Sequence, residues 1–162
     1  MSFSAKSERV RRSLLHPLKF RLYLWRKLPL AACGGLRIDQ LDAERCVVSL
    51  PGGWRTQNPF RSMYFAAQSM AAEMSTGAPA LTLAMGSDAS ISTLVLGIRG
   101  EFVKKAVGRC SFAFDDVAAM ARAIGHAAAG SEPVGYVARS TGRMTDHTVV
   151  ARFEITWTFK RR

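Results

Sequence analysis

The residue of this sequence best suited to chemistry is Glu73. It lies in a stretch, residues 62–98, without any Lys, Arg or His, although the chain carries a formal net charge of +11. A buried carboxylate without a nearby cation is costly, so it either pairs with an arginine from elsewhere in the fold or has a raised pKa. A carboxyl group with a raised pKa can act as a general base or a nucleophile. The residues around Glu73 leave both the structural ion pair and the catalytic role open.

A helix over residues 58–77 is expected to position Glu73. Its only acidic residue is Glu73 and its only basic residue is Arg61. One face is apolar, and small residues occupy much of the remainder; at 100° per residue the apolar face comprises Met63, Ala66, Ala67, Met70, Ala71 and Met74. A helix that is apolar or small on nearly all sides is enclosed. The sequence therefore predicts an α+β fold in which an antiparallel sheet wraps around one long central helix.

Alternating residues predict the strands of that sheet. The clearest strand covers residues 149–159, where every second residue is apolar. Residues 133–140 are expected to form its hairpin partner, and residues 91–105 and 108–114 are expected to pair with each other. Further short strands and one Ala-rich helix are predicted at residues 36–39, 45–50 and 115–129.

The N-terminal segment is basic. Residues 1–29 contain eight Lys or Arg residues and one acidic residue, Glu8. Residues 5–28 predict an amphipathic helix, or two helices divided at Pro17. We therefore divide the chain into a helical N-terminal segment, residues 1–33, and one domain, residues 34–162.

Two placements of residues 5–28 remain open: packing on the domain, or peripheral contact with a membrane surface. The basic charge suits an anionic neighbour such as a membrane, a phosphorylated ligand or a nucleic acid. However, one amphipathic stretch is too short for a helix-turn-helix domain, and no aromatic-rich RNA-binding strands are present. The sequence therefore predicts no nucleic-acid partner.

The cysteines argue against a disulfide framework and a metal site. Cys33, Cys46 and Cys110 form no close pair and no cluster with histidine. The longest stretch without a charge, residues 74–87, has 14 residues, fewer than the roughly 20 that a spanning helix needs. We therefore expect a protein of the reducing cytoplasm, either free or at the inner membrane surface.

The segment around the central helix resembles a known superfamily. Asn58 precedes Glu73 by 15 residues, and the segments NPFRSMYF (residues 58–65) and AEMSTG (residues 72–77) frame that spacing. Together with the order of strands over residues 34–160, they resemble the hotdog-fold acyl-CoA thioesterase superfamily, and an uncharacterised bacterial branch of it in particular. The resemblance implies an acyl-CoA hydrolase that works as a homodimer or a tetramer, with no cofactor other than the coenzyme A of its substrate.

The resemblance also implies roles for individual residues. Asn58 would orient the thioester or the attacking water, the backbone N–H of Phe65 would bind the oxyanion, and Glu73 would be the general base or nucleophile. Further substrate contacts would come from Tyr64, Ser69 and Thr76. The phosphates of coenzyme A would meet Lys104, Lys105 and Arg109.

The chain also departs from the superfamily pattern. Tyr64-Phe65-Ala66 replaces a frequent His-Gly-Gly, and Gly77 stands where some members carry a hydroxyl. The bulky ring of Phe65 would narrow the acyl pocket or block the amide, so a protein that binds acyl-CoA without cleaving it is the alternative. Phe65 and Glu73 are eight residues apart, or about 12 Å along one helix. One thioester carbonyl cannot reach both, so the implied mechanism requires a dimer with two equivalent sites.

Overall fold

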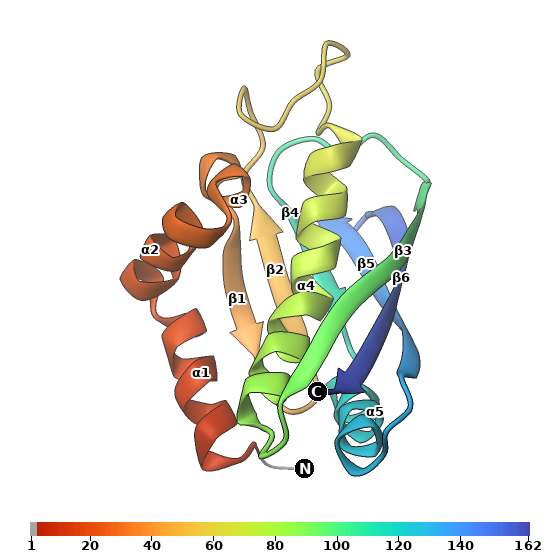
Figure 1. The fold of residues 1–162 in the computed structure, drawn as a ribbon. Helices are drawn as coiled ribbons and strands as arrows, with labels where there is room; N and C mark the ends of the chain where they lie inside the picture. Colours follow the sequence, from red (N-terminus) through yellow and green to blue (C-terminus); the bar gives the residue numbers. More distant parts are fainter. Residues whose placement is uncertain (1–2) are drawn as a thin grey trace.

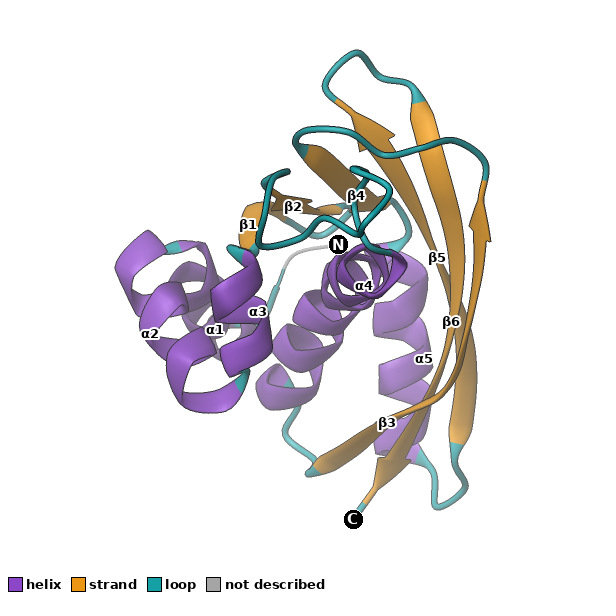
Figure 2. Ribbon diagram, turned by 90° about the horizontal axis from the view of Figure 1, so that it is seen from above, coloured by secondary structure: helices purple, strands orange, loops and turns teal. Residues whose placement is uncertain are grey.

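The centre of the molecule is one long helix, α4 (Phe65–Gly86), with a six-stranded antiparallel sheet curved around it (Figures 1 and 2). The computed structural model describes residues 3–162. Small buried residues of α4 allow the helix to lie close to the sheet; among them are Ala71, Ala72, Ser75, Thr76 and Ala78. The arrangement confirms the predicted α+β hotdog fold.

The sheet has the strand order β1-β2-β4-β5-β6-β3. Its strands are β1 (Arg37–Leu41), β2 (Cys46–Leu50), β3 (Ile91–Phe102), β4 (Cys110–Phe114), β5 (Val134–Met144) and β6 (Val149–Arg161). The β5–β6 hairpin is confirmed, and alternate residues of β6 from Ala151 to Phe159 are buried. The predicted pairing of residues 91–105 with residues 108–114 is wrong. β3 pairs with β6 at one edge of the sheet, whereas β4 lies between β2 and β5.

The central helix begins later and ends later than the sequence predicts. Residues 51–64 form a loop with one isolated bridge, and α4 starts at Phe65 and continues through Pro79 to Gly86. A proline inside a helix removes one backbone hydrogen bond, a cost that tertiary packing must offset. Pro79 is buried, and α4 is tied to the sheet by a 2.8 Å hydrogen bond between the hydroxyls of Ser75 and Ser140.

Three helices precede the sheet: α1 (Ala5–Leu15), α2 (Pro17–Lys27) and α3 (Pro29–Gly34). The chain breaks between α1 and α2 at His16, in agreement with the predicted division at Pro17. α1 packs against α4 and β1, and the guanidinium of Arg11 donates a 3.0 Å hydrogen bond to the carbonyl of Leu41. A fifth helix, α5 (Val117–Ala129), packs on β5 and β6. None of the helices in residues 3–162 is long and apolar enough to cross a bilayer.

Candidate functional site

The N-terminus of α4 presents unpaired backbone donors. The first helical bond runs from the N–H of Gln68 to the carbonyl of Tyr64 (3.2 Å), and the Tyr64 side chain makes no capping bond. Within residues 3–162, the N–H groups of Phe65, Ala66 and Ala67 therefore have no helical partner. Together with the helix dipole they form a site that stabilises negative charge.

Asn58 shapes the loop in front of these donors. Its Oδ1 accepts hydrogen bonds from the backbone N–H groups of Phe60 (3.0 Å) and Ser62 (3.2 Å). The N–H of Met63 then donates to the carbonyl of Ala106 (2.8 Å), which joins the loop to the segment after β3. The side chain of Asn58 thus has a structural role through its oxygen, and its Nδ2 group is left to donate elsewhere.

The loop and the helix N-terminus enclose one side of a cavity of about 540 Å³. Five of the residues that the resemblance implies line it: Asn58, Tyr64, Phe65, Lys104 and Lys105. Aromatic rings form part of its wall, with the centroids of Phe65 and Phe102 6.3 Å apart. The cavity therefore combines apolar surface, two ammonium groups and the free amides of α4.

Gln68 also lines this cavity, and sequence reasoning missed it. Its side chain is only 4% exposed, and its Nε2 donates to the carbonyl of Met63 (3.2 Å). Its Oε1 is buried without a hydrogen-bond partner. A buried acceptor normally finds a donor from the protein, water or a ligand. The signal in the sequence was a long polar amide in a helix of small and apolar residues.

Glu73 lies farther along α4, outside the cavity. It shares one row of the helix with Phe65, Ser69 and Gly77, at steps of four residues, and it is partly exposed. No ion pair in residues 3–162 involves Glu73. Burial raises the pKa of its carboxyl group above the ordinary range. The structural ion pair that the sequence left open is therefore absent from the described part of the chain.

The surroundings of Glu73 explain how the carboxylate is accommodated. A methyl group at Gly77 would lie 2.8 Å from the Oε1 of Glu73 and 3.6 Å from the ring of Trp157. The glycine thus leaves the space that the carboxylate occupies. Tyr23 of α2 lies near enough for the charge of Glu73 to act on it: burial and, secondarily, that charge raise the pKa of Tyr23. Sequence reasoning did not single out Tyr23, because it lies 50 residues from Glu73 and only the fold brings the two within electrostatic range.

Three other predicted site residues lie outside the cavity and form hydrogen bonds or ion pairs within the protein. The hydroxyl of Ser69 donates to the carbonyl of Phe65 (2.9 Å), and that of Thr76 donates to the carbonyl of Glu73 (2.9 Å). Thr76 also accepts a 3.0 Å bond from the indole N–H of Trp157. The predicted phosphate ligand Arg109 bonds to Ser49 (2.6 Å) and forms an ion pair with Asp39 (3.1 Å). Residues 3–162 contain no group of three or more His, Cys, Asp or Glu side chains placed to hold a metal ion.

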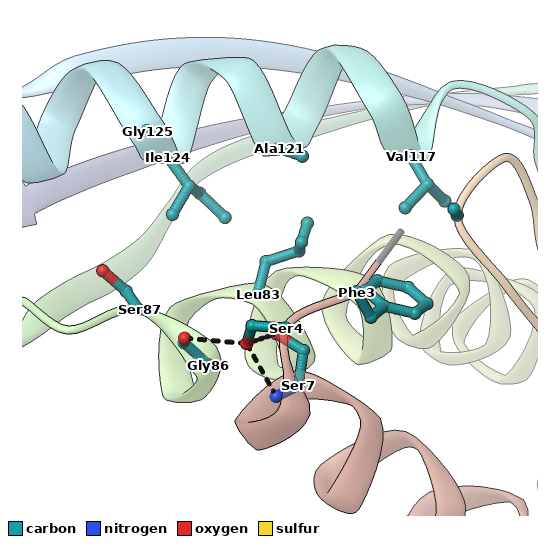
Figure 3. Close-up of a pocket in the computed structure, with 11 residues that line it drawn as sticks. Phe3, Ser4, Ser7, Leu83, Gly86, Ser87, Val117, Ala121, Ile124 and Gly125 are labelled. Carbon is teal, nitrogen blue, oxygen red and sulfur yellow. Dashed lines mark hydrogen bonds between the residues drawn. The ribbon is translucent and has the colours of Figure 1, made fainter. Parts of the chain in front are cut away.

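A second, smaller cavity of about 250 Å³ lies at the opposite end of α4 (Figure 3). Leu83 of α4 and Ile124 of α5 face it, and Phe3 lies at its side. The hydroxyl of Ser4 donates to the carbonyl of Gly86 (3.1 Å) and so joins α1 to the end of α4. None of the described residues that line this cavity has a titratable side chain.

The raised pKa of Glu73 predicts a pH-dependent effect of Glu73→Gln on stability. The carboxyl group of Glu73 binds its proton more tightly in the folded chain than in the unfolded chain. The free energy of unfolding therefore falls as pH rises from about 4.3, the ordinary value for a glutamate, through the pKa of Glu73 in the folded protein. Glutamine stays neutral, so we expect the variant to be more stable than wild type at pH 7 and to lose this advantage near pH 4. Thermal melts across this range measure the difference. The exposed Glu132→Gln is the matched control, and an equal shift for both variants would contradict the prediction.

The family model described as a domain of unknown function, DUF4442, matches residues 18–159. A search of the curated proteins found no matching sequence. One similar solved structure is a Pseudomonas aeruginosa protein of unknown function, named as a probable thioesterase. It is 20% identical in sequence and has a TM-score of 0.73, and the match covers 90% of this chain and 97% of the Pseudomonas chain. A Chlorobaculum tepidum protein of unknown function is 12% identical with a TM-score of 0.74 (91% and 98% covered), and a Haemophilus influenzae thioesterase is 11% identical with a TM-score of 0.65 (89% and 90% covered). The TM-scores show that these proteins share the fold of this chain, at low sequence identity.

Proposed function

This chain belongs to the DUF4442 family, and from that membership and the hotdog fold we propose that it hydrolyses acyl-CoA-type thioesters. One observation carries the proposal: Glu73, a partly buried carboxylate with no ion-pair partner in residues 3–162, shares a helix row with the unpaired amide of Phe65. A base and an oxyanion donor are the two groups that thioester hydrolysis needs. The thioesterase names of structural neighbours support the same reaction.

The reaction requires two copies of the chain. Glu73 and the amide of Phe65 are about 12 Å apart along α4, so one carbonyl reaches both only if they come from different subunits. The edge strand β3 supports such a dimer, because its side chains Leu94, Leu96 and Ile98 are about half exposed or more. A long apolar edge strand is a template for pairing with another chain. We expect a twofold axis perpendicular to β3, so that β3 of one subunit runs antiparallel to β3 of the other and the two α4 helices are also antiparallel.

In this dimer the carboxylate of Glu73 removes a proton from water as the water oxygen bonds to the thioester carbon. The carbonyl oxygen becomes an oxyanion and accepts a hydrogen bond from the N–H of Phe65 of the other subunit. The intermediate then breaks its carbon–sulfur bond, and the proton on Glu73 passes to the departing thiolate. A direct attack by Glu73, through an acyl anhydride that water hydrolyses, gives the same products.

The polar groups of the cavity fit the coenzyme A arm of such a substrate. In the proposed complex, the Nδ2 group of Asn58 donates a hydrogen bond to the thioester. The unpartnered Oε1 of Gln68 is an acceptor for an amide N–H, and the pantetheine arm carries such groups. Lys104 and Lys105 lie where ammonium groups can meet phosphates.

The lysine pair gives a prediction on binding. We expect the double variant Lys104→Gln/Lys105→Gln to raise the KM for acyl-CoA about tenfold with little change in kcat, because two phosphate contacts are lost. An acyl-pantetheine substrate, which has no phosphate, is the matched control and should show equal KM values for variant and wild type. Equal loss on both substrates would contradict a phosphate role.

The direct test of the proposed activity is release of coenzyme A. The purified protein is assayed with acyl-CoAs of increasing chain length and a thiol reagent, and we expect turnover for part of this series. Sedimentation velocity on the same preparation should show a dimer or a tetramer. A monomer that turns over acyl-CoA would contradict the shared site.

The alternative function is binding of an acyl-CoA without hydrolysis. The ring of Phe65 is 55% exposed beside its own amide, with its centroid 4.7 Å from that of Tyr64, so it could keep a thioester away from the donor. Calorimetric binding of acyl-CoA with no thiol release over hours would favour this alternative.

A further inference from the structure

Helix α2 has apolar side chains on two opposite faces. Phe20 and Leu24 are buried against the rest of the molecule, at 5% and 2% exposure. Leu18, Leu22 and Trp25 point away from it, at 76%, 59% and 51% exposure. The first face explains how α2 is held in the fold. The second face has no packing partner within residues 3–162.

The outward side chains form a continuous stripe. Leu18, Leu22 and Trp25 follow steps of four and three residues, so they lie on one side of the helix. Leu30, at the start of α3, is also 76% exposed. Figure 2 shows α2 on the side of the molecule opposite the strands β3, β5 and β6. The stripe is therefore separate from the β3 edge that the proposed dimer uses.

Basic residues border the stripe. Lys19, Arg21, Arg26 and Lys27 are all exposed, and none of the ion pairs in residues 3–162 involves them. No acidic residue occurs between Glu8 and Asp39. Most basic residues of α1 differ: Arg11 and Arg12 bond to Glu8 and Lys6 pairs with Asp88, which leaves Arg9 without an ion pair among the described residues. The free positive charge of the N-terminal segment is thus concentrated on α2.

We propose that the outward face of α2 docks on the surface of an anionic lipid bilayer. An apolar stripe enters the boundary between headgroups and acyl chains, a tryptophan suits that interface, and the bordering ammonium and guanidinium groups attract lipid phosphates. The sequence left two placements open for residues 5–28, packing on the domain or contact with a membrane. Under this proposal α1 packs on the domain, whereas α2 packs on the molecule with one face and contacts the membrane with the other. A nucleic acid would match the charge but not the apolar stripe.

Vesicle co-sedimentation with the full chain tests the proposal. We expect the protein to pellet with vesicles of phosphatidylcholine and phosphatidylglycerol, and to stay largely in solution with phosphatidylcholine alone. Leu22→Gln/Trp25→Gln should weaken binding at least about tenfold. Val137→Gln, a change of an exposed apolar residue on β5, is the matched control and should bind as wild type does.

A second pair of variants separates charge from burial and guards against misfolding. Arg21→Gln/Arg26→Gln should weaken binding about 30-fold, at roughly tenfold per 1.4 kcal/mol and about 1 kcal/mol per basic residue at an anionic surface. Lys160→Gln/Arg162→Gln removes the same charge from the C-terminus and should have little effect. Thermal melts should leave all four variants near the wild-type Tm.

Three results would overturn the proposal. The first is equal pelleting with both kinds of vesicle, or with neither. The second is a concentration-dependent oligomer that Leu22→Gln/Trp25→Gln abolishes while vesicle binding persists, which would make the stripe a contact between copies. The third is a salt-dependent gel shift of duplex DNA or RNA without vesicle binding.

Discussion

Replacing Glu73 with alanine is expected to lower the kcat for acyl-CoA hydrolysis by at least about 100-fold, the scale of losing a general base. Residues 62–98 offer no substitute on the same segment, because Asp88 is the only other acidic residue there and it pairs with Lys6 (2.7 Å) at the surface. Rates of coenzyme A release at saturating substrate measure the loss. Glu132→Ala, at an exposed position, is the matched control and should keep wild-type activity.

The pH profile gives this prediction a second readout. The base works as a carboxylate, and burial raises its pKa, so the acid limb of kcat/KM should lie above the value of about 4.3 that is ordinary for a glutamate. Activity of Glu73→Ala at the wild-type level would remove this residue from the mechanism. An acid limb at or below the ordinary value would contradict the role as base.

Replacing Phe65 with proline is expected to lower kcat by about 100-fold to 1,000-fold, the loss caused by removing one oxyanion donor. Phe65 is the first residue of α4, the helical position that proline favours, and its N–H makes no helical hydrogen bond that the substitution would break. The preceding residue, Tyr64, has a φ of −63° and an extended ψ of 138°, which is compatible with a following proline. The variant thus removes the donor and keeps the helix.

Phe65→Ala is the matched control for the proline variant. It keeps the backbone N–H and removes the ring, so we expect activity at or above the wild-type level because the cavity is opened. Thermal melts should show both variants folded. Wild-type activity of both variants would show that the amide is not the oxyanion donor. An equal loss of activity in both variants would assign the effect to the ring.

The two inactive variants can also test whether the site is shared. A mixed dimer of Glu73→Ala and Phe65→Pro contains one intact site only if the base and the donor come from different subunits. Refolded equimolar mixtures should then recover about a quarter of wild-type activity, since half of the dimers are mixed and each has one intact site. A mixture without recovered activity would place both groups in one subunit.

The sequence alone determined the features that depend on the pattern of residues within one element, such as the buried face of a strand and the enclosure of a helix. The alternation of residues 149–159 predicted which side chains of β6 are buried, because successive residues of a strand face opposite sides. The small residues of α4 predicted an enclosed helix, and the absence of basic residues from residues 62–98 predicted that Glu73 has no cation on its own segment. The class of fold follows from these features.

Only the tertiary structure decided what depends on contacts distant in sequence. Strand β3 pairs with β6 and not with its neighbour in the chain, and α4 continues through Pro79 because packing offsets the lost hydrogen bond. Thr76 and Arg109 bond to partners far away in the chain, Trp157 and Asp39. The cavity joins the loop before α4 with Lys104 and Lys105, and the outward stripe of α2 becomes visible once its other face is packed. Residue spacing encodes the periodicity of one element, whereas the relative placement of elements is set by the burial of their combined apolar surface.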